Sequence, residues 1–212
     1  MCEFKPTYSL YKTVYDGTTT NSYIPVYGYW CDAAQRSEFI IPSTAVTDIS
    51  GATINSMKFY ANYNYSGNGT FQVYVREVNE SSFSNTTYYT ADGATTVYTG
   101  KLTISSTDGM TIEFNEPGYD YDGGNLLVGF YQATGANAAS SSSSFYGQTV
   151  TGASISHYST NSPSQKNFIP KTTFGYIPSN TPKPRNIQVS DITASQATVS
   201  WEAPATGTPT GD

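Results

Sequence analysis

The chain has 212 residues and a formal net charge of −6 at pH 7, from 10 Lys and Arg against 16 Asp and Glu. The basic residues are few and scattered, which argues against a nucleic-acid-binding surface, since such surfaces need clustered Lys and Arg. No stretch approaches the ~20 apolar residues of a membrane-spanning helix. We therefore expect one or two domains, no nucleic-acid partner and no membrane span.

The composition favours strands and turns over helices. Tyr (19) and Gly (18) are frequent, and Ser, Thr and Asn are abundant, while charged residues make up only 12% of the chain. Short apolar or alternating runs recur between Gly, Asn, Asp and Pro clusters. The predicted strands are 8–14, 37–41, 54–63, 70–78, 95–104, 110–114, 126–132, 144–147 and 172–177. This pattern predicts an all-β chain with an antiparallel, jelly-roll-like β-sandwich.

Several predicted strands distribute their side chains between two faces. In 110–114, Met110 and Ile112 alternate with Thr111 and Glu113, as expected of a half-buried strand. Phe71, Val73 and Val75 alternate in the same way with polar or larger neighbours. The segment 125–131 is apolar on both faces, so we expect it at the centre of a sheet.

The C-terminal part differs from what precedes it. Three prolines punctuate 178–184, so we expect an extended linker there, with a first domain at 1–179 and a second unit at 180–212. Two short strands are predicted in that unit, at 187–190 and 197–202, and Trp201 lies in the second. Two strands are too few to close a sandwich. We expect them to be loosely ordered, or to add to the first domain or to a neighbouring chain.

Cys2 and Cys31 are the two cysteines, and they could form one disulfide in an oxidising compartment. Two unpaired thiols are the alternative, because the sequence does not supply the geometry that a disulfide requires. The first residues contain no apolar segment typical of a secretory signal. If the protein is exported, its signal is either removed or upstream.

The densest aromatic segment, 23–30, suggests a ligand-binding surface. A sugar ring can stack on an exposed phenol or indole while neighbouring polar groups bind its hydroxyls. Tyr27, Tyr29 and Trp30 are our candidate residues. The alternative is that these rings pack against one another across strands.

Asp120, Asp122 and Asn125 lie in a Gly-containing turn, Asp-Tyr-Asp-Gly-Gly-Asn. Calcium prefers several oxygen ligands, and two carboxylates on a sharply turning loop could provide some of them. A plain turn between strands explains the same residues. We expect no cofactor, with calcium at this turn as the alternative.

The residues needed for catalysis are poorly represented. His157 is the sole histidine, and it lies among serines without the nucleophile elbow of a Ser-His-Asp enzyme. A glycosidase would need two carboxylates facing each other across a groove. The candidates for such a pair are Glu38, Glu77, Glu113 and Glu116. Acidic residues are also expected on the polar faces of strands, so we predict a protein without catalytic residues.

Two resemblances bear on function. The segments 16–28, 54–60, 71–75, 97–100, 112–114 and 121–128, in that order, resemble a β-sandwich module of large secreted proteins of gut Bacteroidota. The segment 182–204 resembles the first two strands of a fibronectin type III module, in which the Trp of the second strand fills the core. Both imply an extracellular or cell-surface protein built of several domains.

From these observations we expect a non-catalytic module that acts in adhesion or glycan recognition. Its partners would be a glycan or another cell-surface ligand, together with neighbouring domains of the same polypeptide. The alternatives are a structural spacer without a ligand and a jelly-roll polysaccharide-degrading enzyme.

Overall fold

The computed structural model describes residues 9–27, 30–31, 35–89, 92–134, 137–138, 143–179 and 185–202. Within these ranges the helical elements are two short 3-10 turns, Ser43–Ala45 and Thr47–Ile49. Every strand pair described is antiparallel. The prediction of an all-β, antiparallel chain is therefore confirmed.

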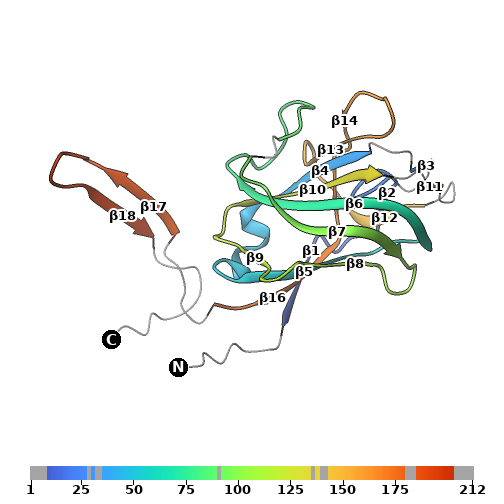
Figure 1. The fold of residues 1–212 in the computed structure, drawn as a ribbon, viewed down its shortest axis with the longest axis horizontal. Helices are drawn as coiled ribbons and strands as arrows, with labels where there is room; N and C mark the ends of the chain where they lie inside the picture. Colours follow the sequence, from blue (N-terminus) through green and yellow to red (C-terminus); the bar gives the residue numbers. More distant parts are fainter. Residues whose placement is uncertain are drawn as a thin grey trace.

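The first of the two main sheets has the strand order β1-β16-β5-β8, with the short strand β9 also paired to β5. Its strands are β1 (Leu10–Val14), β16 (Thr172–Ile177), β5 (Thr53–Phe59), β8 (Met110–Glu113) and β9 (Tyr119–Asp120). Strands from both ends of the described sandwich thus lie next to each other (Figure 1).

The second sheet has the order β14-β13-β4-β10-β6-β7. Its strands are β14 (Ser164–Gln165), β13 (Ser154–His157), β4 (Arg36–Ile41), β10 (Asn125–Thr134), β6 (Tyr65–Val78) and β7 (Thr95–Ile104). Strand β10 lies between β4 and β6, and its residues 126–130 are all buried. This confirms the prediction that the doubly apolar segment is central.

The two sheets face each other and enclose the main hydrophobic core (Figure 1). Phe59 comes from the first sheet, and Phe39 and Phe130 come from the second. The Phe59 ring lies edge-on to both, with centroids 6.1 Å from Phe39 and 5.7 Å from Phe130. Such edge-to-face contacts favour one packing arrangement beyond simple burial of apolar area.

The described structure also contains two smaller sheets and a C-terminal hairpin. Strand β12 (Phe145–Thr149) lies between β15 (Phe168–Pro170) and β2 (Thr19–Asn21). Strand β3 (Trp30–Cys31) pairs with β11 (Asn137–Ala138). Among the described residues there is no helix with the length and apolar character needed to cross a bilayer.

A second, smaller hydrophobic cluster lies on the other face of the six-stranded sheet. Ile40, Leu127 and Ile155 contribute from the sheet, and Phe83 lies on them from the segment 79–89. The Gln165 side chain donates a hydrogen bond to the Phe83 carbonyl at 3.0 Å. The outer face of this sheet is therefore partly covered.

The strands β17 (Arg185–Ser190) and β18 (Thr198–Glu202) form a hairpin that Figure 1 shows set apart from the sandwich. The two predicted strands are therefore present, and in the described structure they pair with each other instead of extending a sandwich sheet. Trp201 is 62% exposed. The fibronectin type III resemblance stays a prediction.

Candidate functional site

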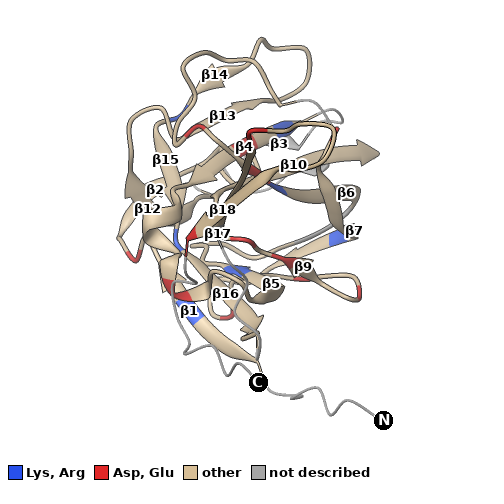
Figure 2. Ribbon diagram, turned by 90° about the vertical axis from the view of Figure 1, so that its left-hand side faces the viewer, with Lys and Arg blue, Asp and Glu red and all other residues tan. Residues whose placement is uncertain are grey.

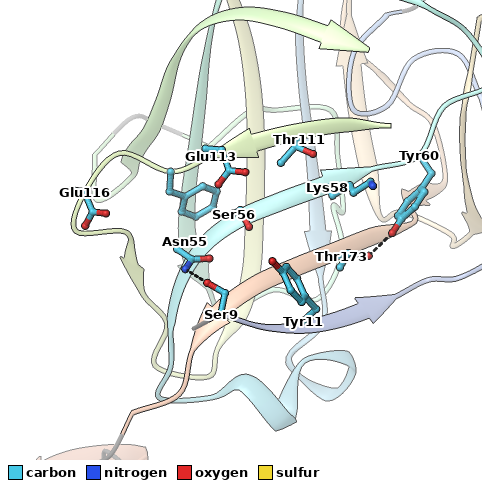
Figure 3. A pocket seen from close by; sticks show the side chains of 11 residues that line it. Ser9, Tyr11, Asn55, Ser56, Lys58, Tyr60, Thr111, Glu113, Glu116 and Thr173 are labelled. Atoms are coloured by element: carbon cyan, nitrogen blue, oxygen red, sulfur yellow. Dashed lines mark hydrogen bonds between the residues drawn. The ribbon is translucent and has the colours of Figure 1, made fainter. Parts of the chain in front are cut away.

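A groove of about 680 Å³ lies on the outer face of the first sheet (Figure 3). It crosses all four strands of the β1-β16-β5-β8 order, a width of about 14 Å at the usual strand spacing of ~4.8 Å. Aromatic, amide, hydroxyl and charged side chains share its walls. They are Ser9, Tyr11, Asn55, Ser56, Lys58, Tyr60, Thr111, Glu113, Phe114, Glu116 and Thr173.

The local sequence of β5 explains why polar side chains gather there. Ile54 and Met57 are buried, and the two residues between them, Asn55 and Ser56, both line the groove. The register shifts at this point, because Gly175 lies opposite Ser56 whereas Tyr176 lies opposite Ile54. A β-bulge of this kind places an extra residue in one strand and re-aims its side chains. Here it brings two consecutive polar side chains to one face.

The polar side chains of the bulge lie close over Gly175. A Cβ at Gly175 would lie 2.3 Å from Ser56 Oγ, 2.9 Å from Asn55 Oδ1 and 3.4 Å from Tyr11 Cε1. Any larger side chain there would therefore displace Ser56 and Asn55. The glycine thus allows the bulge to present these two side chains at the wall of the groove.

Some side chains of the groove are held by hydrogen bonds, and one aromatic ring is largely exposed to water. Asn55 Nδ2 donates a hydrogen bond to Ser9 Oγ at 2.6 Å, and the Tyr60 hydroxyl lies 2.8 Å from Thr173 Oγ1. Tyr11 is 73% exposed, and Figure 3 shows its ring standing above the sheet beside these polar groups. Lys58 Nζ lies 5.5 Å from the Tyr60 ring centroid. The groove thus offers an exposed aromatic face, donors and acceptors within one hollow.

No family model matches the chain, and neither a curated protein nor a solved structure is significantly similar to it. The function must therefore be inferred from the groove and from the rest of the described structure.

Of the predicted aromatic ligand-binding residues, Tyr27 does not line the groove. Tyr27 is only 7% exposed, and its ring stacks on Tyr23 and Tyr158 with centroid distances of 5.2 and 4.2 Å. This burial leaves little of the Tyr27 ring for a ligand and favours the packing alternative. Tyr29 lies outside the described residues, and Trp30 is described only as part of the backbone of β3. A ligand-binding role for those two residues stays a prediction.

The predicted metal ligands are each held by protein groups. Asp120 Oδ1 accepts a hydrogen bond from Thr53 at 2.6 Å, and Asn125 Oδ1 accepts one from the Ser43 amide at 2.9 Å. The amide of Asp122 donates to the Glu77 carboxylate at 2.7 Å. No group of three or more His, Cys, Asp or Glu suited to a metal occurs among the described residues. The calcium alternative stays a prediction.

Next to these residues lie the half-buried Tyr119 and the buried Tyr121. Burial raises the pKa of Tyr119 and of Tyr121, and the nearby Glu77 carboxylate raises both further. The Tyr121 hydroxyl donates to the Gly124 carbonyl at 2.6 Å. These contacts explain the turn as a structural element that closes the end of the sheet.

Of the four glutamates considered for a catalytic pair, two make structural hydrogen bonds and two line the groove. Glu38 is fully buried and accepts hydrogen bonds from Arg36 at 2.7 Å and from Tyr74 at 2.6 Å, while Glu77 holds the turn described above. Glu113 and Glu116 line the groove. Both are exposed to water.

His157 does not line the groove. His157 Nδ1 lies 2.9 Å from the Tyr88 hydroxyl, and the two rings meet edge to face. Cys2 lies outside the described residues, and of Cys31 only the backbone is described, so the disulfide stays a prediction.

Sequence reasoning did not select this groove, although two signals pointed to it. The pair Asn55-Ser56 interrupts the alternation of β5, and a lone glycine, Gly175, lies within the apolar pattern of β16. An interrupted alternation and a glycine inside a strand both indicate a bulge or a close approach. Gly175 and the Asn55-Ser56 pair meet because β16 pairs with β5, and these two strands are far apart in the chain.

Proposed function

We propose that this chain is a non-catalytic module of an extracellular or cell-surface protein, and that it binds a glycan in the groove of the first sheet. The observation that carries the proposal is the exposed Tyr11 ring beside the polar bulge of Asn55 and Ser56 in one groove.

The chemistry of the groove suits a sugar better than other ligands. An exposed phenol provides a surface for the apolar face of a sugar ring, and amide, hydroxyl and carboxylate groups beside it match the ring hydroxyls. Lys58 is accompanied by Glu113 and Glu116 in the same groove. Elsewhere the basic residues are spread over the strands instead of being clustered (Figure 2), so a polyanion such as a nucleic acid is disfavoured.

The extracellular, multidomain part of the proposal rests on the resemblances noted in the sequence. A jelly-roll-like module followed by the start of a fibronectin type III module is typical of secreted proteins with several domains in series. In such an array, weak contacts of single modules gain avidity when linkers of suitable length join them. Adhesion to a glycan-bearing surface is the role that fits this arrangement.

The test uses binding to immobilised xylan, glucomannan, laminarin and mucin. Tyr11→Ala removes the exposed ring, and Gly175→Val introduces a residue suited to a strand that displaces the Ser56 and Asn55 side chains. We expect each change to weaken binding about tenfold or more, equivalent to about 1.4 kcal/mol. Tyr131→Ala is the matched control, because Tyr131 is 38% exposed but belongs to the other sheet.

Two results would overturn the proposal. Absence of binding to the four polymers, or binding that is unchanged in both groove variants, would favour a structural spacer. Release of reducing sugar that the double variant Glu113→Gln and Glu116→Gln abolishes would instead favour a polysaccharide-degrading enzyme. Circular dichroism of each variant shows whether the fold is retained.

A further inference from the structure

A second hollow of about 260 Å³ adjoins the groove, and Tyr60 lines both. Its other walls come from the turn between β7 and β8, from the segment before β2, from the residue after Tyr60, from β12 and from the residue between β15 and β16. They are Asp16, Gly17, Thr18, Ala61, Ser106, Thr107, Gly109, Tyr146 and Lys171.

Backbone hydrogen bonds connect walls of the second hollow to the end of β5. The end of β5 bridges to β12 at Ala61 and Phe145, and the Tyr146 amide donates to the Tyr60 carbonyl at 2.8 Å. The Lys171 amide then donates to the Tyr146 carbonyl, also at 2.8 Å. These bonds fix the positions of Tyr146 and Lys171 relative to Tyr60. Figure 3 shows Tyr60 at one end of the first groove.

The second hollow has the same kind of chemistry as the first. Asp16 and Lys171 form an ion pair at 2.5 Å and place an acceptor beside a donor, an arrangement that matches neighbouring hydroxyls of a sugar. Lys171 Nζ lies 4.5 Å from the Tyr60 ring centroid, and the Tyr146 ring is half-buried in the same wall. The hollow therefore provides aromatic and hydrogen-bonding groups of its own.

Glycine also shapes this second hollow. A Cβ at Gly17 would lie 2.4 Å from the Gly147 carbonyl oxygen, and one at Gly109 would lie 2.2 Å from the Phe59 carbonyl oxygen. Because both obstacles are backbone atoms, larger residues at these positions would displace the walls. Gly17 and Gly109 thus allow the close approach of backbone segments on which these walls depend.

We infer that the two hollows form one extended site for a linear glycan, which runs across Tyr60 and occupies both. The inference rests on the proposed function and specifies its ligand class: a polymer segment of several sugar units, in preference to a single sugar or a chain end. A short oligosaccharide fills only the larger groove. A longer one also reaches Asp16 and Lys171.

The test compares short and long probes by isothermal titration calorimetry. The probes are the disaccharides and hexasaccharides of the xylan, mannan and laminarin series. We expect a hexasaccharide to bind about tenfold more tightly than its disaccharide. In the double variant Asp16→Asn and Lys171→Met, this difference should disappear while disaccharide affinity is unchanged. Tyr11→Ala should weaken the binding of both lengths.

The matched control is the double variant Lys12→Met and Asp48→Asn. It removes the other exposed Lys–Asp ion pair, whose residues line neither hollow. Equal affinity for both lengths, or a hexasaccharide affinity that the Asp16 and Lys171 variant leaves unchanged, would overturn the extended site while leaving the groove intact. Absence of binding by all six probes would contradict the proposed function and the extended site together.

Discussion

Two glycines inside strands lie under side chains of a neighbouring strand. A Cβ at Gly129 would lie 2.1 Å from the Tyr74 ring, and that ring is fixed because its hydroxyl donates to Glu38 and accepts from Arg36. A Cβ at Gly175 would meet chiefly the Ser56 hydroxyl, which can rotate away. The first glycine makes room for a fixed ring, and the second makes room for the polar side chains of the bulge.

This contrast predicts different costs for the same substitution. Gly129→Ala should lower the free energy of unfolding by about 1–3 kcal/mol, because the added methyl overpacks a fixed ring. Gly175→Ala should cost less, because alanine loses less backbone entropy in a strand and its neighbour can move. Urea denaturation of the two variants measures the difference. Equal losses would mean that the Tyr74 ring is free to shift.

The segment 79–89 is held on the six-stranded sheet by a buried carboxylate. Glu38 Oε2 accepts a hydrogen bond from the Tyr89 amide at 3.0 Å, while its Oε1 accepts from Arg36 and Tyr74. Arg36 also donates to the Tyr89 carbonyl at 2.9 Å. Burial raises the pKa of Tyr74, and the negative charge of Glu38 raises it further, so the phenol stays a donor.

We expect Glu38→Gln to lower the free energy of unfolding by about 2–3 kcal/mol. A neutral amide has only one acceptor oxygen, so one of the three donors would face the NH2 group. Hydrogen exchange should rise first at Tyr89 and along 79–88, because this segment depends on the carboxylate. Glu113→Gln is the control, since an exposed glutamate should change stability by less than ~0.5 kcal/mol. Unchanged exchange in the segment would contradict the assigned role of Glu38.

The sequence predicted the burial pattern and the central position of particular strands better than it predicted the location of the groove. The central position of 125–131 and the alternation of 110–114 follow from apolar patterns within one strand, and the structure confirms both. The groove depends on Gly175 meeting a bulge at Asn55, and these residues are 120 positions apart. A pattern within one strand does not specify the register with a distant partner. The aromatic run 23–30 drew the prediction because its rings are abundant, and in the described structure Tyr23 and Tyr27 of that run stack on each other.

The described structure contains a sandwich and a hairpin with exposed apolar residues, and Asn186 and Ile187 of the hairpin line a hollow together with the 122–125 turn of the sandwich. Ile187, Val189 and Trp201 are 60%, 55% and 62% exposed. The hairpin strands share no ladder with the sandwich sheets in the described structure. A two-stranded hairpin alone is marginally stable in water.

We therefore expect the fragment 1–179 to melt within about 2 °C of the full chain. Thermal unfolding followed by circular dichroism measures this. The fluorescence lost on truncation should be the red-shifted emission of a water-exposed indole, because Trp201 is removed. A fall of ~10 °C or more would instead show that the hairpin and the sandwich unfold as one cooperative unit.

Strands β1 and β16 have a mechanical consequence for a protein built of modules in series. Leu10 lies opposite Tyr176 and Val14 opposite Thr172, so the described chain enters and leaves the sandwich through neighbouring antiparallel strands. Tension between the two strand ends would load their hydrogen bonds one after another, starting at Leu10, as in opening a zipper. Ser9 and Tyr11 would be drawn out of the groove first. A glycan held there would be released by pulling before the rest of the sandwich opens.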